Sequence, residues 1–281
     1  MIKDIVVPLT GTAGDANAVA AALELATAEG AHLALLELVN LPVPVPGPWG
    51  MVPDASMAGL YDELRAQSEQ RAVKWREKLK TSGIMGEVRV VESLFVEPPR
   101  TAAINARYAD MSIISGADPG DAGAAATIHP FFSELLMESG GPVLVVPPSS
   151  RPTSARGHAV VAWRPTPEAS RALHDALPLL RRAATVDVVV VDPRSGESGD
   201  GEQPGADIAT HLARHDLRVN VVALESGSRS VAQVLLSHAR ETRADLLVAG
   251  GYGHSRFREW ALGGATREML EQSHLPVLFS H

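Results

Sequence analysis

Short, nearly continuous apolar runs alternate along the chain with segments whose apolar residues recur at helical spacing. The runs occupy residues 5–9, 33–39, 87–91, 111–115 and 143–146, then 159–163, 186–191, 218–223, 246–249 and 277–279. Runs of this length without polar alternation are typical of parallel strands covered on both faces. The intervening patterns predict helices at residues 17–29, 56–80, 98–107 and 131–138, then 167–182, 206–215, 230–243 and 265–273. We therefore expect an α/β fold.

The two halves of the chain repeat each other. The dipeptide Ala-Asp precedes an apolar run at residues 109–110 and again at 244–245, and Pro-Val-Leu occurs at 142–144 and again at 276–278. A pattern that returns at a constant offset indicates a duplicated structural unit. The sequence thus predicts two tandem five-stranded parallel-sheet sandwiches, residues 1–148 and 155–281. A Pro- and Ser-rich linker at 147–158 separates them, and the first contains an additional Pro-rich loop at 41–53.

Composition removes several classes of function. The chain has no cysteine, which excludes a thiol nucleophile, a disulfide framework and thiolate zinc sites. Its 25 Lys and Arg residues against 33 Asp and Glu residues give a net charge of -8 with no basic block, so we expect no nucleic-acid partner. No apolar run reaches the roughly 18 residues of a membrane span. We expect a cytoplasmic protein without membrane contact.

A glycine-rich segment follows the fourth apolar run of the second half. Gly250, Gly253 and Gly263 keep separations of three and ten residues, and a predicted helix begins immediately afterwards. Glycines allow the backbone to approach an anion, and a helix start directs free N–H groups toward it. In open parallel sheets, ligands bind at this carboxyl end of the strands. The pattern favours an anion site, although a tight turn packed by neighbouring aromatic residues would have a similar sequence.

This spacing resembles that of the universal stress protein family, whose ATP-binding members hold phosphates with Gly-x-x-Gly, nine residues, then Gly-Ser or Gly-Thr. The resemblance extends over both halves, as a tandem member. It implies that such domains pair through their last strands, 143–146 and 277–279, with a homodimer as a further option. It also implies an adenine nucleotide, with Mg²⁺ if that nucleotide is ATP, and a second-domain site made of these residues: Gly250, Gly253, Ser255, Gly263, Gly264 and Thr266.

The sequence departs from the family pattern at several positions. Gly264 stands where the family has Ser or Thr, and Thr10 and Arg164 stand where ATP-binding members have an Asp after the first strand of each domain. In the first half the glycine loop is lost, and Asp118 and Asp121 lie where an anion would sit. Two carboxylates disfavour phosphate there. We therefore expect nucleotide sensing or binding in the second domain only.

Two other functions remain open on the sequence. The fold could serve as a nucleotide-free interaction scaffold, with the segment 41–58 contacting a protein partner not yet identified. Slow ATP hydrolysis is the third hypothesis, but no general base accompanies the glycine loop, so no catalytic residue is assigned. His211 and His215 have a spacing that can hold zinc, yet a third ligand is not evident and no metal site is expected.

Overall fold

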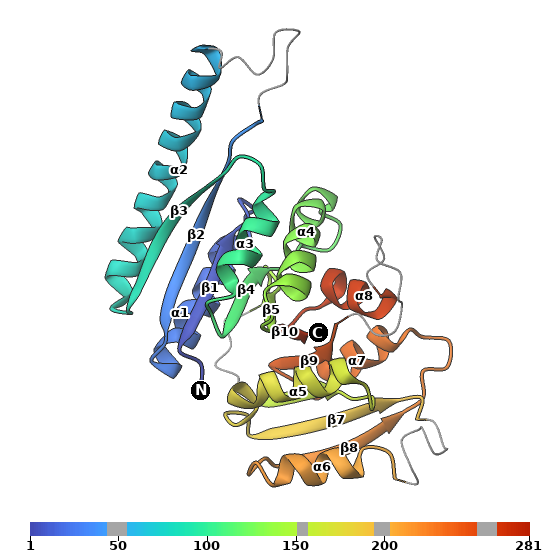
Figure 1. Cartoon of the computed structure of the whole chain (residues 1–281). Helices are drawn as coiled ribbons and strands as arrows, with labels where there is room; N and C mark the ends of the chain where they lie inside the picture. The colour runs from blue at the N-terminus through green and yellow to red at the C-terminus, as the bar shows by residue number, and fades with distance from the viewer. Residues whose placement is uncertain (44–54, 151–156, 194–202, 252–262) are drawn as a thin grey trace.

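The computed structural model describes residues 1–43, 55–150, 157–193, 203–251 and 263–281. Within them the strands form one ten-stranded sheet of order β3-β2-β1-β4-β5-β10-β9-β6-β7-β8 (Figure 1). The strands are β1 Asp4–Leu9, β2 His32–Asn40, β3 Gly86–Ser93, β4 Met111–Ser115, β5 Val143–Val146, β6 His158–Ala162, β7 Thr185–Val191, β8 Val219–Leu224, β9 Leu246–Gly250 and β10 Val277–Ser280. Each run that the sequence pattern assigned to a strand is a strand, with ends that agree within two residues.

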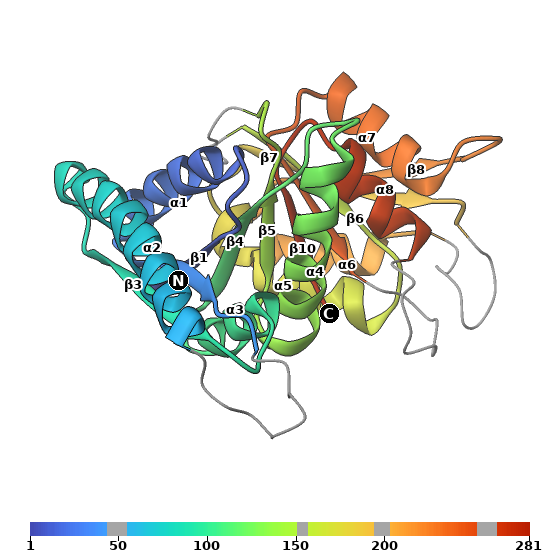
Figure 2. The same ribbon diagram turned by 90° about the horizontal axis from the view of Figure 1, so that it is seen from above.

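Helices cover both faces of the sheet. Their bounds are α1 Asp15–Glu29, α2 Ala55–Ser82, α3 Pro98–Ala106, α4 Ala122–Glu138, α5 Pro167–Leu180, α6 Ala206–Ala213, α7 Val231–Glu241 and α8 Gly264–Gln272. Buried residues of α1, α2, α5 and α6 form one apolar layer, and those of α3, α4, α7 and α8 form the other. In Figure 2, α1 lies on one side of the first-half strands, and α3 and α4 lie on the other. The covered faces explain why the inner strands are apolar without alternation, whereas the edge strands β3 and β8 are partly exposed.

Helix α4 differs from the prediction, which began it at residue 131. The helix begins nine residues earlier, at Ala122, and continues through Pro130. Asp121 caps it by accepting a hydrogen bond from the Ala124 backbone N–H at 2.9 Å. This cap and the buried Ile128 stabilise the first turns, and they offset the one hydrogen bond that an internal proline removes.

The two halves have the same strand order and are joined edge to edge. Each half consists of five parallel strands, and β5 pairs with β10 in the antiparallel sense, with Leu144 opposite Leu278. This is the pairing of last strands that the family resemblance implied, here within one chain. Phe132 of α4 covers the junction, because its ring meets the ring of Phe279 edge to face at 5.1 Å. The two halves therefore share one sheet and both apolar layers.

The repeat extends to individual hydrogen bonds. The Asp110 carboxylate accepts hydrogen bonds from the backbone N–H groups of Lys3 and Asp4, at 2.6 and 3.0 Å. In the second half Asp245, the counterpart of Asp110, accepts one from the Gly157 N–H at 2.9 Å. The same carboxylate thus ties down the start of the central strand in both halves.

Among the described residues, none of the helices combines the length and apolar character that crossing a membrane requires. Two segments that the sequence singled out lie largely outside the described residues. They are the Pro-rich loop, within 44–54, and the centre of the linker, within 151–156.

Candidate functional site

The order of the strands reverses at the centre of each half. In the second half β6 pairs with β9 on one side and with β7 on the other, and in the first half β1 lies between β4 and β2. Helices leave such neighbouring strands in opposite directions and open a crevice at their carboxyl ends. The predicted glycine loop begins at the carboxyl end of β9 and therefore lies at this position. Gly253 and Ser255 of that loop lie outside the described residues.

Close packing requires the first two glycines of the loop. A Cβ on Gly250 would come within 2.8 Å of backbone atoms of Glu168 and Ala169, at the start of α5. A Cβ on Gly251 would lie 2.5 Å from a Leu136 methyl group of the first half. Gly251 also donates its N–H to the Ser280 carbonyl at 2.8 Å. These two glycines have a packing role that needs no ligand.

The second pair of glycines has no such packing role. Gly263 is the N-cap of α8, and no side chain caps the helix by a hydrogen bond. A Cβ built on Gly264, the first residue of α8, has no atom within 4 Å. Thr266 in the same turn is buried, with 4% of its surface exposed. The N–H groups of the first turn have no intrahelical acceptors, so this helix end can accept an anion.

The position after β6 carries no carboxylate. Arg164 is exposed, and its carbonyl accepts a hydrogen bond from the Thr166 N–H that shapes the turn into α5. A carboxylate comes instead from Glu168, which sequence reasoning missed. Its Oε2 is buried without a hydrogen-bond partner among the described residues, and its Cβ lies beside Gly250. Only the packing of α5 on β9 brings Glu168 to the crevice.

The corresponding crevice of the first half is closed by its own side chains. The Asp15 carboxylate accepts hydrogen bonds from the Thr10 N–H and Oγ1–H and from the Gly11 N–H, at 3.1, 2.7 and 2.8 Å. Burial raises the pKa of Asp15 more than these hydrogen bonds lower it. Asp121 occupies the start of α4 as its cap. The backbone N–H groups that a ligand would meet, after β1 and at the start of α4, therefore already donate hydrogen bonds to Asp15 and Asp121.

Five of the described histidines lie in two groups. His174 of α5 joins His211 and His215, with ring centroids 5.2 and 4.9 Å from that of His211. The sequence did not reveal this third imidazole. Nevertheless, in the described part of the chain no three His, Cys, Asp or Glu residues are arranged to hold a metal ion.

The second group surrounds Asp187, which sequence reasoning also missed. Its carboxylate contacts the Nε2 atoms of His238 and His158, at 2.8 and 3.0 Å, and accepts a hydrogen bond from Asn220 at 3.0 Å. Burial acts to raise the pKa of Asp187, but the hydrogen bonds and the nearby imidazoles outweigh it and hold the pKa below its ordinary value. Asp187 lies near the amino end of β7, away from the crevice. We assign this group to structure.

Comparisons with known proteins agree with this geometry. A family model described as the universal stress protein family matches residues 156–281, whereas the curated proteins gave no match. The crystal structure of a universal stress protein from Archaeoglobus fulgidus DSM 4304 is similar over 99% of this chain and 97% of its own, at 16% identity and a TM-score of 0.74. A functionally unknown protein from Pseudomonas aeruginosa PAO1 is similar over 99% and 92%, at 15% identity and 0.58. Residues 156–281 thus match the universal stress protein family, and the chain over both halves has the fold of the Archaeoglobus fulgidus protein.

Proposed function

We propose that the second half binds an adenine nucleotide and that the first half does not, so that the chain senses or holds one nucleotide. The observation that carries this proposal is the difference between the two equivalent helix starts. Helix α4 is capped by the Asp121 carboxylate, whereas α8 begins at Gly263-Gly264 with no side-chain cap. An uncapped helix start after a glycine-rich loop is a suitable place for a phosphate group.

The chain offers further groups for the nucleotide around this helix start. Backbone N–H groups of Gly250, Gly253, Gly263 and Gly264 would face the phosphates, with the hydroxyl groups of Ser255 and Thr266 as additional donors. With ATP bound, Mg²⁺ would accompany the phosphates. Glu168 supplies a carboxylate acceptor at the edge of the crevice, where Arg164 lacks one. This acceptor is suited to a ribose hydroxyl, which donates hydrogen bonds to carboxylates.

The test is a calorimetric titration of the folded chain with magnesium ATP, and with AMP as the comparison ligand. Gly264→Asp introduces a carboxylate into open space at the first position of α8, so it should repel phosphate while leaving the helix stable. We expect about one saturable site per chain in the wild type, tighter for ATP than for AMP, and none in Gly264→Asp. Gly253→Leu should remove binding in the same way.

Ala122→Asp is the matched control, because it adds the same charge at the first position of α4. It should leave nucleotide affinity unchanged. Equal affinity in the wild type and Gly264→Asp would contradict the site, and absence of binding at millimolar ATP would contradict the function. The second outcome would favour the nucleotide-free interaction scaffold.

A further inference from the structure

Helices α7 and α8 lie side by side on the outer face of the second half (Figures 1 and 2). The groove between them contains a cavity of about 310 Å³. Its lining residues are Arg229, Gln233, Leu236, Ser237 and Arg240 of α7 and the turn before it, and Gln272 at the end of α8. Every polar side chain in this set can donate a hydrogen bond, and none is a carboxylate. We call it the arginine groove.

Neither arginine of the groove is neutralised. In the described part of the chain no ion pair joins Arg229 or Arg240 to an acid, although the chain carries a net charge of -8. The neighbouring carboxylates have other partners, since Glu268 accepts the Ser230 hydroxyl and Glu241 accepts that of Ser237. After burial, the charge of Arg240 is the second cause that lowers the pKa of His274. The lining of the groove therefore contains two cationic side chains and no carboxylate.

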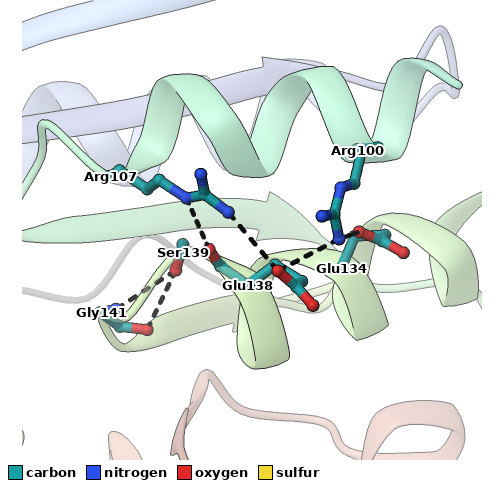
Figure 3. Close-up of polar contacts among 6 residues, drawn as sticks. All are labelled: Arg100, Arg107, Glu134, Glu138, Ser139 and Gly141. Atoms are coloured by element: carbon teal, nitrogen blue, oxygen red, sulfur yellow. Dashed lines mark hydrogen bonds and ion pairs between the residues drawn. The ribbon is translucent and has the colours of Figure 1, made fainter. Parts of the chain in front are cut away.

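The first half shows how the same helix pair neutralises its own arginines. Figure 3 shows Arg100 of α3 between Glu134 and Glu138 of α4, at 3.3 and 3.1 Å, and Arg107 beside Glu138 at 3.4 Å. Glu138 is the last residue of α4, and its counterpart at the end of α8 is Gln272. The second half thus has an amide where the first half has a shared carboxylate. Helices α3 and α4 also make more extensive contact than α7 and α8.

We propose that the arginine groove binds a small molecule that carries two anionic groups, phosphate or carboxylate. A guanidinium group pairs with either of these by two parallel hydrogen bonds. Arg229 lies in the turn before α7 and Arg240 lies near its end, so each end of the groove engages one anionic group. Gln233, Ser237 and Gln272 lie between them and suit hydroxyl groups on a short carbon chain. None of its lining residues is among those assigned to the nucleotide site.

The test is calorimetric titration with fructose 1,6-bisphosphate and with citrate, using fructose as the uncharged control. We expect saturable binding of at least one anionic probe at about one per chain, and none of fructose. Arg229→Gln and Arg240→Gln should each weaken the binding of the anionic probe about tenfold or more, because each removes one charge-assisted hydrogen-bonding contact. Binding should persist in Gly264→Asp, which separates this site from the nucleotide site.

Two further variants use the first half as a guide. Arg100→Gln removes an arginine that already has carboxylate partners, so it should leave the affinity unchanged. Gln272→Glu gives the groove an internal carboxylate, and it should weaken binding while raising the melting temperature. No binding of either anionic probe to the folded wild type would overturn the proposal. It would also be overturned by binding that survives the Arg229→Gln, Arg240→Gln double variant or falls equally in Arg100→Gln.

Discussion

At the scale of single residues, the most consequential polar group is one that no motif indicated. Asp187 is placed within an apolar run, and its side chain is only 6% exposed. A buried carboxylate is tolerated when hydrogen bonds and opposite charges compensate for lost hydration. Here the compensation comes from β6, β8 and α7 through His158, Asn220 and His238. One residue thereby links three elements of the second half.

Replacing Asp187 by Asn should destabilise the fold at neutral pH by about 2 kcal/mol, because an amide lacks the charge that Asn220 and the two imidazoles contact. The folded-state pKa of Asp187 lies below its ordinary value of 3.8, so its stabilisation is present above that pH. The stabilisation is lost as the pH falls through the folded pKa. Urea unfolding at pH 7 and pH 3 measures the effect, and the difference between wild type and variant should shrink at pH 3.

Asp118→Asn changes an exposed loop carboxylate and serves as the control, with an expected effect below about 0.5 kcal/mol. A difference that grew as the pH fell would contradict the assigned role of Asp187.

At the scale of elements, the two halves meet the same packing requirement in opposite ways. The helix after the central strand contacts the end of the fourth strand in each half. In the first half the glycine is on the helix side, because a Cβ on Gly14 would lie 1.8 Å from the Ser115 Oγ. In the second half the glycine is on the strand side, with Gly250 against Glu168. A glycine on one side of this contact is enough. The first half can therefore have Ser115 at the end of its fourth strand, where the second half has Gly250.

Gly14→Ala should therefore destabilise the chain by about 1–3 kcal/mol through overpacking. Ser115→Gly in the same background should recover most of that loss, because it removes the side chain in conflict. A double-mutant cycle by urea unfolding should give a coupling energy above about 1 kcal/mol.

Gly59→Ala is the control, since its Cβ meets no atom within 4 Å in an exposed turn of α2, and it should stabilise by about 0.5–1 kcal/mol. Purely additive effects of Gly14→Ala and Ser115→Gly would contradict the proposed exchange of roles.

At the scale of the whole molecule, the shared sheet couples the two halves. Beyond the β5–β10 pairing, Arg182 of the second half forms an ion pair with Glu29 of the first at 3.1 Å, on the α1 and α5 side. Phe279 lies at the junction, fully buried, and its ring contacts Phe132 from the other half. Because the apolar layers are continuous across the junction, we expect the halves to unfold together.

Phe279→Ala should cost about 3–5 kcal/mol and lower the protection of both halves against hydrogen exchange. Exchange followed by mass spectrometry on peptides from β1 and β7 measures this. The exposed Phe95 provides the control, because Phe95→Ala should change stability by less than about 0.5 kcal/mol. Loss of protection confined to the second half would contradict a single cooperative unit.

The sequence by itself determined the elements, the repeat and the strand edge at which the glycine loop lies. These follow from local properties: apolar runs form strands, helical spacing forms helices, and Ala-Asp and Pro-Val-Leu mark equivalent positions. It misplaced the start of α4, because the pattern did not reveal that Asp121 caps the helix. Only the tertiary structure brought together Glu168 with Gly250, Asp187 with two histidines, and two arginines with Gln272. Each of these groups joins residues far apart in the chain, and no local pattern records which helix faces which strand.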